Sequence, residues 1–166
     1  MTLSSFNSLD KETAATKLFS CCGSRKWVSL MMKTFPFESE TVMAENATTA
    51  WYNECGKEDW LESFTHHHKI GDKKSLSEKF AAKEQESVGS ASEEIIETLA
   101  QANKVYEKKF GFIFIICATG KLATEMLQLL NDRLKNDKET ELNIAMAEQH
   151  KITLLRIKKI IDNENI

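Results

Sequence analysis

The sequence contains little that would interrupt a helix. Its 166 residues include one proline and six glycines, the two residue types that most strongly disfavour helices. Pro36 and nearly all the glycines fall between segments with helical periodicity. We find no internal repeat, low-complexity tract or linker. We therefore expect one all-α domain over residues 1–166, a helical bundle of about seven to nine helices.

The balance of charge and the short apolar runs exclude further classes. The 22 Lys and Arg nearly match the 25 Asp and Glu, for a formal net charge of -3, unlike a basic nucleic-acid-binding domain. Even the apolar run 112–118 is far too short to span a bilayer. The first residues lack the pattern of a secretory signal, and the last residues do not form a peroxisomal signal. We expect a cytoplasmic protein that binds neither nucleic acid nor a membrane.

The cysteines do not form a recognised motif. Cys21, Cys22, Cys55 and Cys117 include no Cys-x-x-Cys pair, and the adjacent Cys21 and Cys22 are poorly placed to bond to each other. The spacing of a structural zinc site is also missing. We expect free, mostly buried thiols in a reducing compartment.

Capping residues and breakers predict where the helices begin and end. The first expected helix starts at Ser8 or Asp10 and stops at Gly23, and the second starts at Ser24 and ends at 34–37. The third starts at Ser39 and ends near Gly56, and a short fourth helix runs from Glu58 to Phe64. Of the later helices, one starts near Ser90, one follows Gly120, and the last runs from Asp137 or Lys138 past Ile160.

The helix after Ser90 should bury one face. Ile95, Leu99, Ala102, Tyr106 and Phe110 recur at helical spacing. The apolar residues 111–118 that follow are too few and too uniform to assign from periodicity.

Three of the four histidines stand together at His66, His67 and His68. An imidazole titrates near neutrality and can move protons between substrate atoms. Three consecutive histidines at a helix end cannot all face one pocket, and on these residues alone a solvated polar run is the favoured interpretation. A metal site would need Asp72 or Glu84 as further ligands, and no His-x-x-x-His pair is present.

Three other polar residues are candidates for a ligand site. Glu84 fits a solvated helix face or a catalytic carboxylate, and Gln85 can hold a carbonyl or amide edge. Arg156 lies among apolar residues, so its guanidinium should meet a planar acceptor, either an internal carboxylate or a ligand. Arg133 reads more simply as an exposed or helix-end residue.

Taken together, these segments resemble the 2-oxo-4-hydroxy-4-carboxy-5-ureidoimidazoline (OHCU) decarboxylase family over nearly the whole chain. The order and spacing of the segments carry the resemblance more than any single motif. The segments are 21–24 with Trp27, 35–37, 59–61, 67–72, Glu84 with Gln85, 110–114, and the tail from Arg133 through Glu141 and Leu142 to Arg156.

The resemblance implies a role for particular residues. His67 matches the catalytic histidine and Glu84 the catalytic glutamate. The matching substrate-binding positions are His68, Gln85, Ile115, Ile116, Cys117, Ala118 and Arg156. Two departures stand out: His68 replaces the proline typical of the family, and Ala81 or Ala82 lies where relatives often have serine.

The implied activity is decarboxylation of OHCU to (S)-allantoin in urate breakdown. The resemblance further implies an all-helical bundle, often a homodimer, that needs no cofactor and no metal. Two alternatives remain open on the residues alone. One is a non-enzymatic helical interaction module, and the other is a metal-dependent hydrolase using the histidine cluster.

Overall fold

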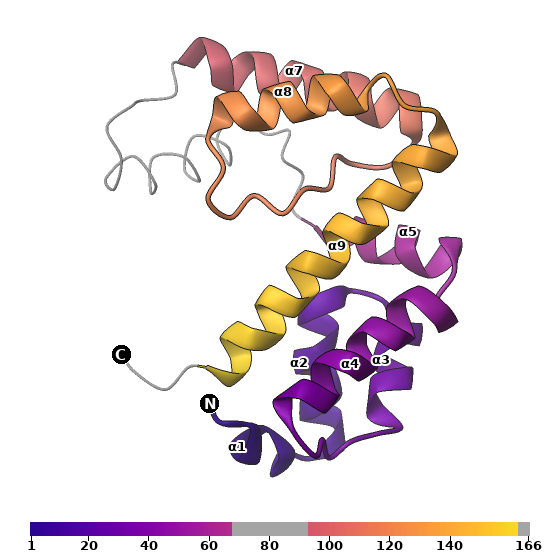
Figure 1. Ribbon diagram of the computed structural model, residues 1–166, viewed down its shortest axis with the longest axis vertical. Coiled ribbons are helices and arrows are strands. Elements are labelled where there is room, and N and C mark those ends of the chain that lie inside the picture. The colour runs from indigo at the N-terminus through magenta and orange to yellow at the C-terminus, as the bar shows by residue number, and fades with distance from the viewer. Residues whose placement is uncertain (68–92, 163–166) are drawn as a thin grey trace. The chain divides into compact units, whose positions relative to one another are not determined.

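The computed structural model describes residues 1–67 and 93–162, and all regular structure within them is helical (Figure 1). The all-α prediction is confirmed. The elements are α1 Leu3–Asn7, α2 Lys11–Cys22, α3 Arg25–Met32, α4 Glu40–Thr49, the π-helical turn η1 Ala50–Glu54, α5 Lys57–Thr65, α7 Glu93–Phe110, α8 Ala123–Arg133 and α9 Lys138–Ile161.

The chain forms two compact units. The first joins Met1–His66 to Met146–Ile166, and the second is His67–Ala145, so that α9 supplies residues to both. The expectation of a single domain over residues 1–166 stays a prediction. Among the described residues, none of the helices combines the length and apolar composition needed to cross a bilayer.

Side-chain caps begin α2, α3 and α4 where the sequence predicts. Asp10 accepts the Thr13 N–H at 2.9 Å, and Ser24 and Ser39 cap the next two helices in the same way. Gly23 ends α2 with φ of 77°, a left-handed conformation that glycine adopts without a steric cost. The five-residue α1 was not predicted, because one turn is too short to show periodicity.

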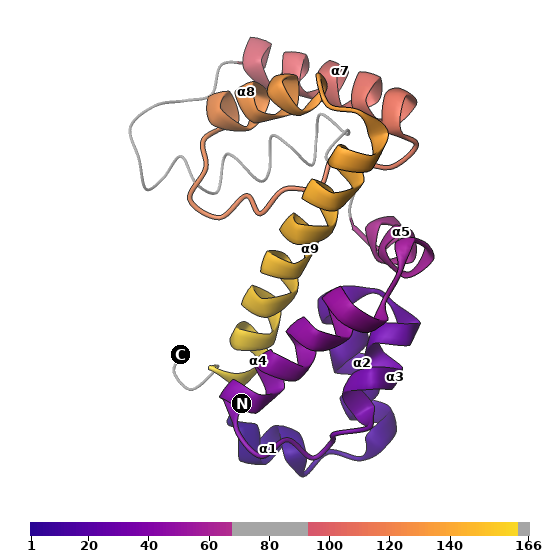
Figure 2. The same cartoon turned by 45° about the vertical axis from the view of Figure 1, so that its right-hand side comes forward.

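In the first unit, α3 packs against α2, α4, η1 and α5, and Figure 2 shows these helices gathered around it. Two buried tryptophans tie the packing to backbone carbonyls. Trp27 Nε1 donates to Ala47 O at 3.0 Å, and Trp51 Nε1 donates to Met146 O at 2.9 Å. Tryptophan thus contributes a large apolar surface while its N–H keeps a partner.

The cysteines carry thiols, as predicted. Cys21, Cys22 and Cys55 are buried in the first unit and form no disulfide. Cys117 of the second unit is half-buried and is likewise not part of a disulfide.

In the second unit, α7 and α8 lie side by side and run in the same direction (Figures 1 and 2). The connecting segment, residues 111–122, makes this possible by returning along the pair in an extended conformation. An extended residue advances about 3.3 Å and a helical residue about 1.5 Å, so a short extended stretch can span a longer helix.

The buried face of α7 is slightly rotated from the predicted one. Leu99, Tyr106 and Phe110 are buried as expected, but Ile96 and Asn103 are buried in place of Ile95 and Ala102. The latter two are only partly buried against the core. That core is completed by residues of the connecting segment and α8, namely Phe114, Ile116, Ala123, Met126 and Leu130.

Candidate functional site

Three of the predicted site residues, His68, Glu84 and Gln85, lie outside the described residues, as do Asp72 and the two alanines at 81 and 82. The described ones are His67, Arg156 and Ile115–Ala118. Arg156 belongs to the first unit, and the others belong to the second.

His67 follows directly on the end of α5, which two contacts fix to the end of α2. The Ser63 hydroxyl donates to the carbonyl of Cys22. The ring of His66 meets Phe19 edge-on, with ring centroids 4.9 Å apart. His66 therefore serves packing, although its side chain remains largely exposed, and the half-buried His67 is the next residue along the chain.

Arg156 lies on α9 with a half-buried side chain. Its Nη1 donates to Ser20 O at 3.4 Å and to Cys21 O at 3.3 Å. These carbonyls are in the last turn of α2, where helical carbonyls lack partners within the helix. The acceptors are therefore main-chain oxygens, and among the described residues no hydrogen bond engages Nε or Nη2. A guanidinium has five N–H donors in a planar fork, so one edge of Arg156 remains suited to a carboxylate.

The predicted substrate-contacting segment runs through the middle of the extended connection. Ile115 and Ile116 are buried, whereas Cys117 and Ala118 are half-buried. Within the described residues, the N–H groups of Ile115 and Ile116 donate to no acceptor. Buried N–H groups in proteins are nearly always paired, which makes these two donors suitable for a ligand oxygen.

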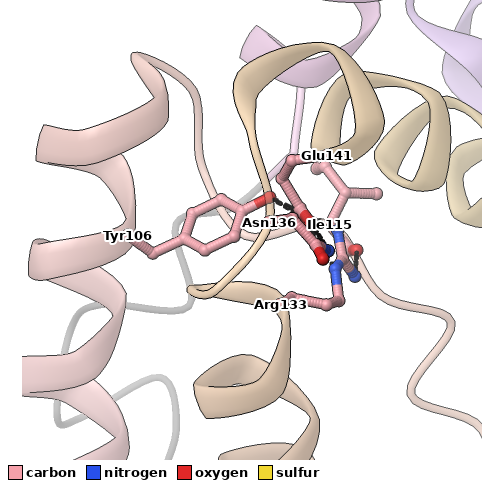
Figure 3. A network of polar contacts seen from close by, with 5 residues as sticks. All are labelled: Tyr106, Ile115, Arg133, Asn136 and Glu141. Atoms are coloured by element: carbon pink, nitrogen blue, oxygen red, sulfur yellow. Dashed lines mark hydrogen bonds and ion pairs between the residues drawn. The ribbon is translucent and has the colours of Figure 1, made fainter.

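A buried polar network holds this segment (Figure 3). Arg133 Nη1 donates to Ile115 O at 2.6 Å. Arg133 also pairs with Glu141, with Nε and Nη2 lying 2.7 Å and 2.5 Å from Oε1. The Tyr106 hydroxyl donates to the same oxygen, and Asn136 Nδ2 donates to Oε2 at 2.9 Å.

The expectation for Arg133 was therefore half wrong. It does stand at the end of α8, but its side chain is only 8% exposed and Glu141 is 0% exposed. The guanidinium also stacks on Phe114, with Cζ 4.6 Å from the ring centroid. Such a pair survives burial because nearly every lone pair and N–H has a partner.

Burial raises the pKa of the Tyr106 hydroxyl; the positive charge of Arg133 opposes this rise, and Glu141 adds to it. The phenol therefore stays protonated and acts as a donor to Glu141. The pattern of the sequence did not reveal Tyr106, Asn136 or Glu141 as a group, because they come from three separate segments. The one available signal was the family-like tail that contains both Arg133 and Glu141.

Metal binding finds no support in the residues that can be described. Among residues 1–67 and 93–162, no three His, Cys, Asp or Glu side chains are grouped to hold an ion. The proposed ligands Asp72 and Glu84 lie outside these ranges. An open hollow beside α4 contains none of the predicted site residues; it is lined by Glu40, Thr41, Ala44, Glu45, Thr48 and Thr49.

Comparison with known proteins decides the family. The profile of the OHCU decarboxylase family matches residues 7–158. The chain belongs to the OHCU decarboxylase family. The resemblance drawn from the sequence is thereby confirmed.

Relatives in this family include longer proteins. A uric acid degradation bifunctional protein of Arabidopsis thaliana is 37% identical over 150 residues, which are 87% of this chain and 46% of that protein. One from Bacillus subtilis is 26% identical over 162 residues, or 96% of this chain and 33% of that protein. The chain thus spans less than half the length of these two relatives.

A solved structure matches along its whole length. The crystal structure of an OHCU decarboxylase in the presence of (S)-allantoin superposes with a TM-score of 0.76 at 37% identity. The match covers 93% of this chain and 100% of that one. The fold of the family therefore extends over nearly all of this sequence.

Proposed function

We propose that this chain is an enzyme of urate degradation that decarboxylates OHCU to (S)-allantoin without a cofactor. The observation that carries the proposal is the family match over residues 7–158. The structural likeness to an OHCU decarboxylase crystallised in the presence of (S)-allantoin supports it.

The chemistry of the substrate requires little from the protein. One ring carbon carries a hydroxyl and a carboxylate, and its neighbour takes part in a carbon–nitrogen double bond. When the bond to the carboxylate breaks, carbon dioxide leaves and the electron pair forms a double bond to the neighbouring carbon. The electron pair of the carbon–nitrogen double bond passes to the nitrogen, which takes up a proton. The hydroxyl then loses its proton as a carbonyl forms, and the neighbouring carbon gains a proton on one face. The substrate is its own electron sink, so acid–base groups and orientation are sufficient.

We assign the acid–base work to His67 and Glu84. His67 hydrogen-bonds the hydroxyl region and moves its proton, and Glu84 orients or polarises this histidine and shares in proton delivery. The polar edges of the substrate are held by His68, Gln85 and Arg156. The N–H groups within 115–118 complete the binding residues. Among the described residues, Nε and Nη2 of Arg156 have no hydrogen-bond partner and the N–H groups of Ile115 and Ile116 donate to no acceptor, which supports the last two assignments.

The deciding experiment follows circular dichroism while the purified chain acts on OHCU generated from urate by urate oxidase and hydroxyisourate hydrolase. We expect faster loss of OHCU than its spontaneous decay, with dextrorotatory (S)-allantoin accumulating. His67→Asn should lower the rate by about a hundredfold to ten-thousandfold, the usual worth of an acid–base step.

His66→Asn is the matched control, because His66 is the neighbouring histidine and its ring packs against Phe19. It should retain most of the wild-type rate. Absence of turnover by well-folded wild-type protein would refute the activity and favour an interaction module. Stoichiometric zinc or manganese in tag-free protein would instead favour a metal-dependent hydrolase.

From the family relationship we also propose that the enzyme is a homodimer and lies in the cytoplasm. Sedimentation equilibrium should give twice the chain mass of 18.9 kDa. A fluorescent fusion should fill the cytoplasm in cells. A monomeric mass or confinement to another compartment would overturn the corresponding part of the proposal.

A further inference from the structure

The two ends of the Ile115–Ile116 peptide group have different surroundings. Its carbonyl oxygen accepts a hydrogen bond from Arg133 Nη1 at 2.6 Å. Its N–H, which belongs to Ile116, donates to no acceptor among the described residues. In a planar trans peptide the C=O and N–H bonds point in opposite directions. Whatever fixes the carbonyl toward Arg133 therefore points the N–H of Ile116 away from Arg133.

Arg133 cannot easily change its own orientation. Glu141 accepts from Nε through one carboxylate oxygen, which also lies 2.5 Å from Nη2, and Tyr106 donates to that same oxygen. Nη2 in turn donates to the Tyr106 hydroxyl at 3.3 Å. Asn136 donates to the other oxygen. Figure 3 shows that these side chains come from α7, α8, the α8–α9 turn and α9 and meet next to Ile115. Turning the guanidinium would break several buried hydrogen bonds at once.

The hydrogen bond from Arg133 to Ile115 O also changes how strongly the Ile116 N–H donates on the opposite side of the peptide group. A charged donor on a carbonyl oxygen withdraws electron density from the peptide group, and hydrogen bonds in series strengthen each other. Since Ile115 and Ile116 are buried, this effect is poorly screened by water. The Ile116 N–H is thus both aimed and polarised by a residue on the opposite side of the peptide.

We propose that Arg133, held by Glu141, is a positioning residue that orients and polarises the Ile115–Ile116 peptide so that Ile116 N–H donates to a carboxylate or carbonyl oxygen of the substrate. The inference rests on the proposed function for the nature of that oxygen. Arg133 itself does not touch the substrate. A pair that served only to stabilise the fold would leave the properties of this one amide and the affinity for substrate unchanged.

Arg133→Lys is the test variant, because lysine keeps the charge but lacks the planar fork needed to meet both Glu141 and Ile115 O. Leu99→Ala is the control, because Leu99 is fully buried in the core of the same unit and takes part in none of the hydrogen bonds described for the network. Both substitutions should weaken the fold. Measurements are made at a temperature where circular dichroism shows each variant to be folded.

The first readout is the ¹⁵N–¹H resonance of Ile116, which does not depend on activity. We expect a large shift in Arg133→Lys and little change in Leu99→Ala. We also expect (S)-allantoin to shift the resonance in wild-type protein. An Ile116 resonance that is unaffected by Arg133→Lys would overturn the proposal. This readout remains valid if the wild-type chain does not decarboxylate OHCU, so the two failures can be told apart.

The second readout is turnover of OHCU. Loss of one well-aimed donor to a charged substrate group should lower kcat/KM about tenfold, mainly through KM. Leu99→Ala should stay within about threefold of wild type. If Arg133→Lys does not fold, Glu141→Gln takes its place, since it removes the charge that orients Arg133. If kcat/KM fell equally in the network variant and in Leu99→Ala, the network would have a purely structural role.

Discussion

The Cβ of His66 lies 2.8 Å from the position that a Cβ on Gly23 would occupy. Gly23 has φ of +77°, so an alanine there would meet both backbone strain and a close contact. The left-handed conformation alone costs about 1–2 kcal/mol for a residue with a Cβ, and the contact should add about 1–3 kcal/mol. Gly23→Ala should thus lower the free energy of unfolding, measured by urea denaturation, by more than the strain alone.

Gly120→Ala separates the two effects. Gly120 has the same φ of +77°, but among the described residues no atom lies within 4 Å of the point where the alanine methyl group would stand. It should show only the strain of about 1–2 kcal/mol. Equal losses in the two variants would mean that His66 gives way without cost, and that the end of α5 is not tightly fixed before His67.

Burial lowers the pKa of His150 from its ordinary value of 6.5. Its Nε2 lies 3.0 Å from Thr48 Oγ1, its ring meets Tyr52 edge-on, and its Nδ1 has no hydrogen-bond partner among the described residues. Below about pH 6.5 the unfolded chain takes up a proton that the folded chain resists. The free energy of unfolding should therefore be fully retained above that pH and fall as the pH drops.

His150→Gln removes this contribution. The difference in unfolding free energy between wild type and His150→Gln should shrink as the pH falls from 7 to 5. Using the difference cancels the titration of the other groups. A difference that is constant or grows on acidification would contradict the neutral, buried state of His150.

The four thiols should differ in reactivity. Burial raises the pKa of Cys22 to about 12 and the pKa values of Cys21 and Cys55 to about 11. The thiolate is the reacting form, so these three should react with Ellman's reagent only after unfolding. Cys117, which is half-buried in the candidate site, should react first in the native protein. Cys117→Ser should abolish the fast phase, and a remaining fast phase would show that the core opens.

Trp51→Phe should destabilise the first unit. The substitution removes the hydrogen bond from Nε1 to Met146 O and leaves a buried carbonyl without this donor. We expect a loss of about 1–3 kcal/mol in thermal or urea unfolding. Trp60→Phe is the control, because Trp60 is only partly buried and its longer 3.3 Å bond reaches Trp51 O. An equal loss of unfolding free energy in Trp51→Phe and Trp60→Phe would argue against a special role for the contact with Met146 O.

Local signals in the sequence predicted most of the helices. Asp10, Ser24 and Ser39 cap their helices through N–H groups three residues on, so both partners lie within one turn. Gly23 ends α2 for an equally local reason. The rotated face of α7 shows the limit of periodicity, because Asn103 is buried through its bond to Leu99 O rather than through apolar character.

The conformation of residues 111–118 depends on residues far away in the sequence. Ile115 is held by Arg133, which in turn is held by Glu141, eight residues further on and across a helix break. Neighbouring charges such as Asp132 and Lys135 made Arg133 look like a surface residue. Its burial is a tertiary effect that no single segment encodes. The same holds for Arg156, whose acceptors are main-chain oxygens at the end of another helix.

The order of the buried pair along the chain has an electrostatic consequence. Arg133 is in the last turn of α8, and Glu141 is in the first turn of α9. The peptide dipoles of a helix favour a cation at its C-terminal end and an anion at its N-terminal end. Each charge is thus stabilised by its own helix as well as by its partner. Exchanging the two residues would restore the ion pair but set both charges against the helices that carry them, so this corner of the fold tolerates the pair in only one polarity.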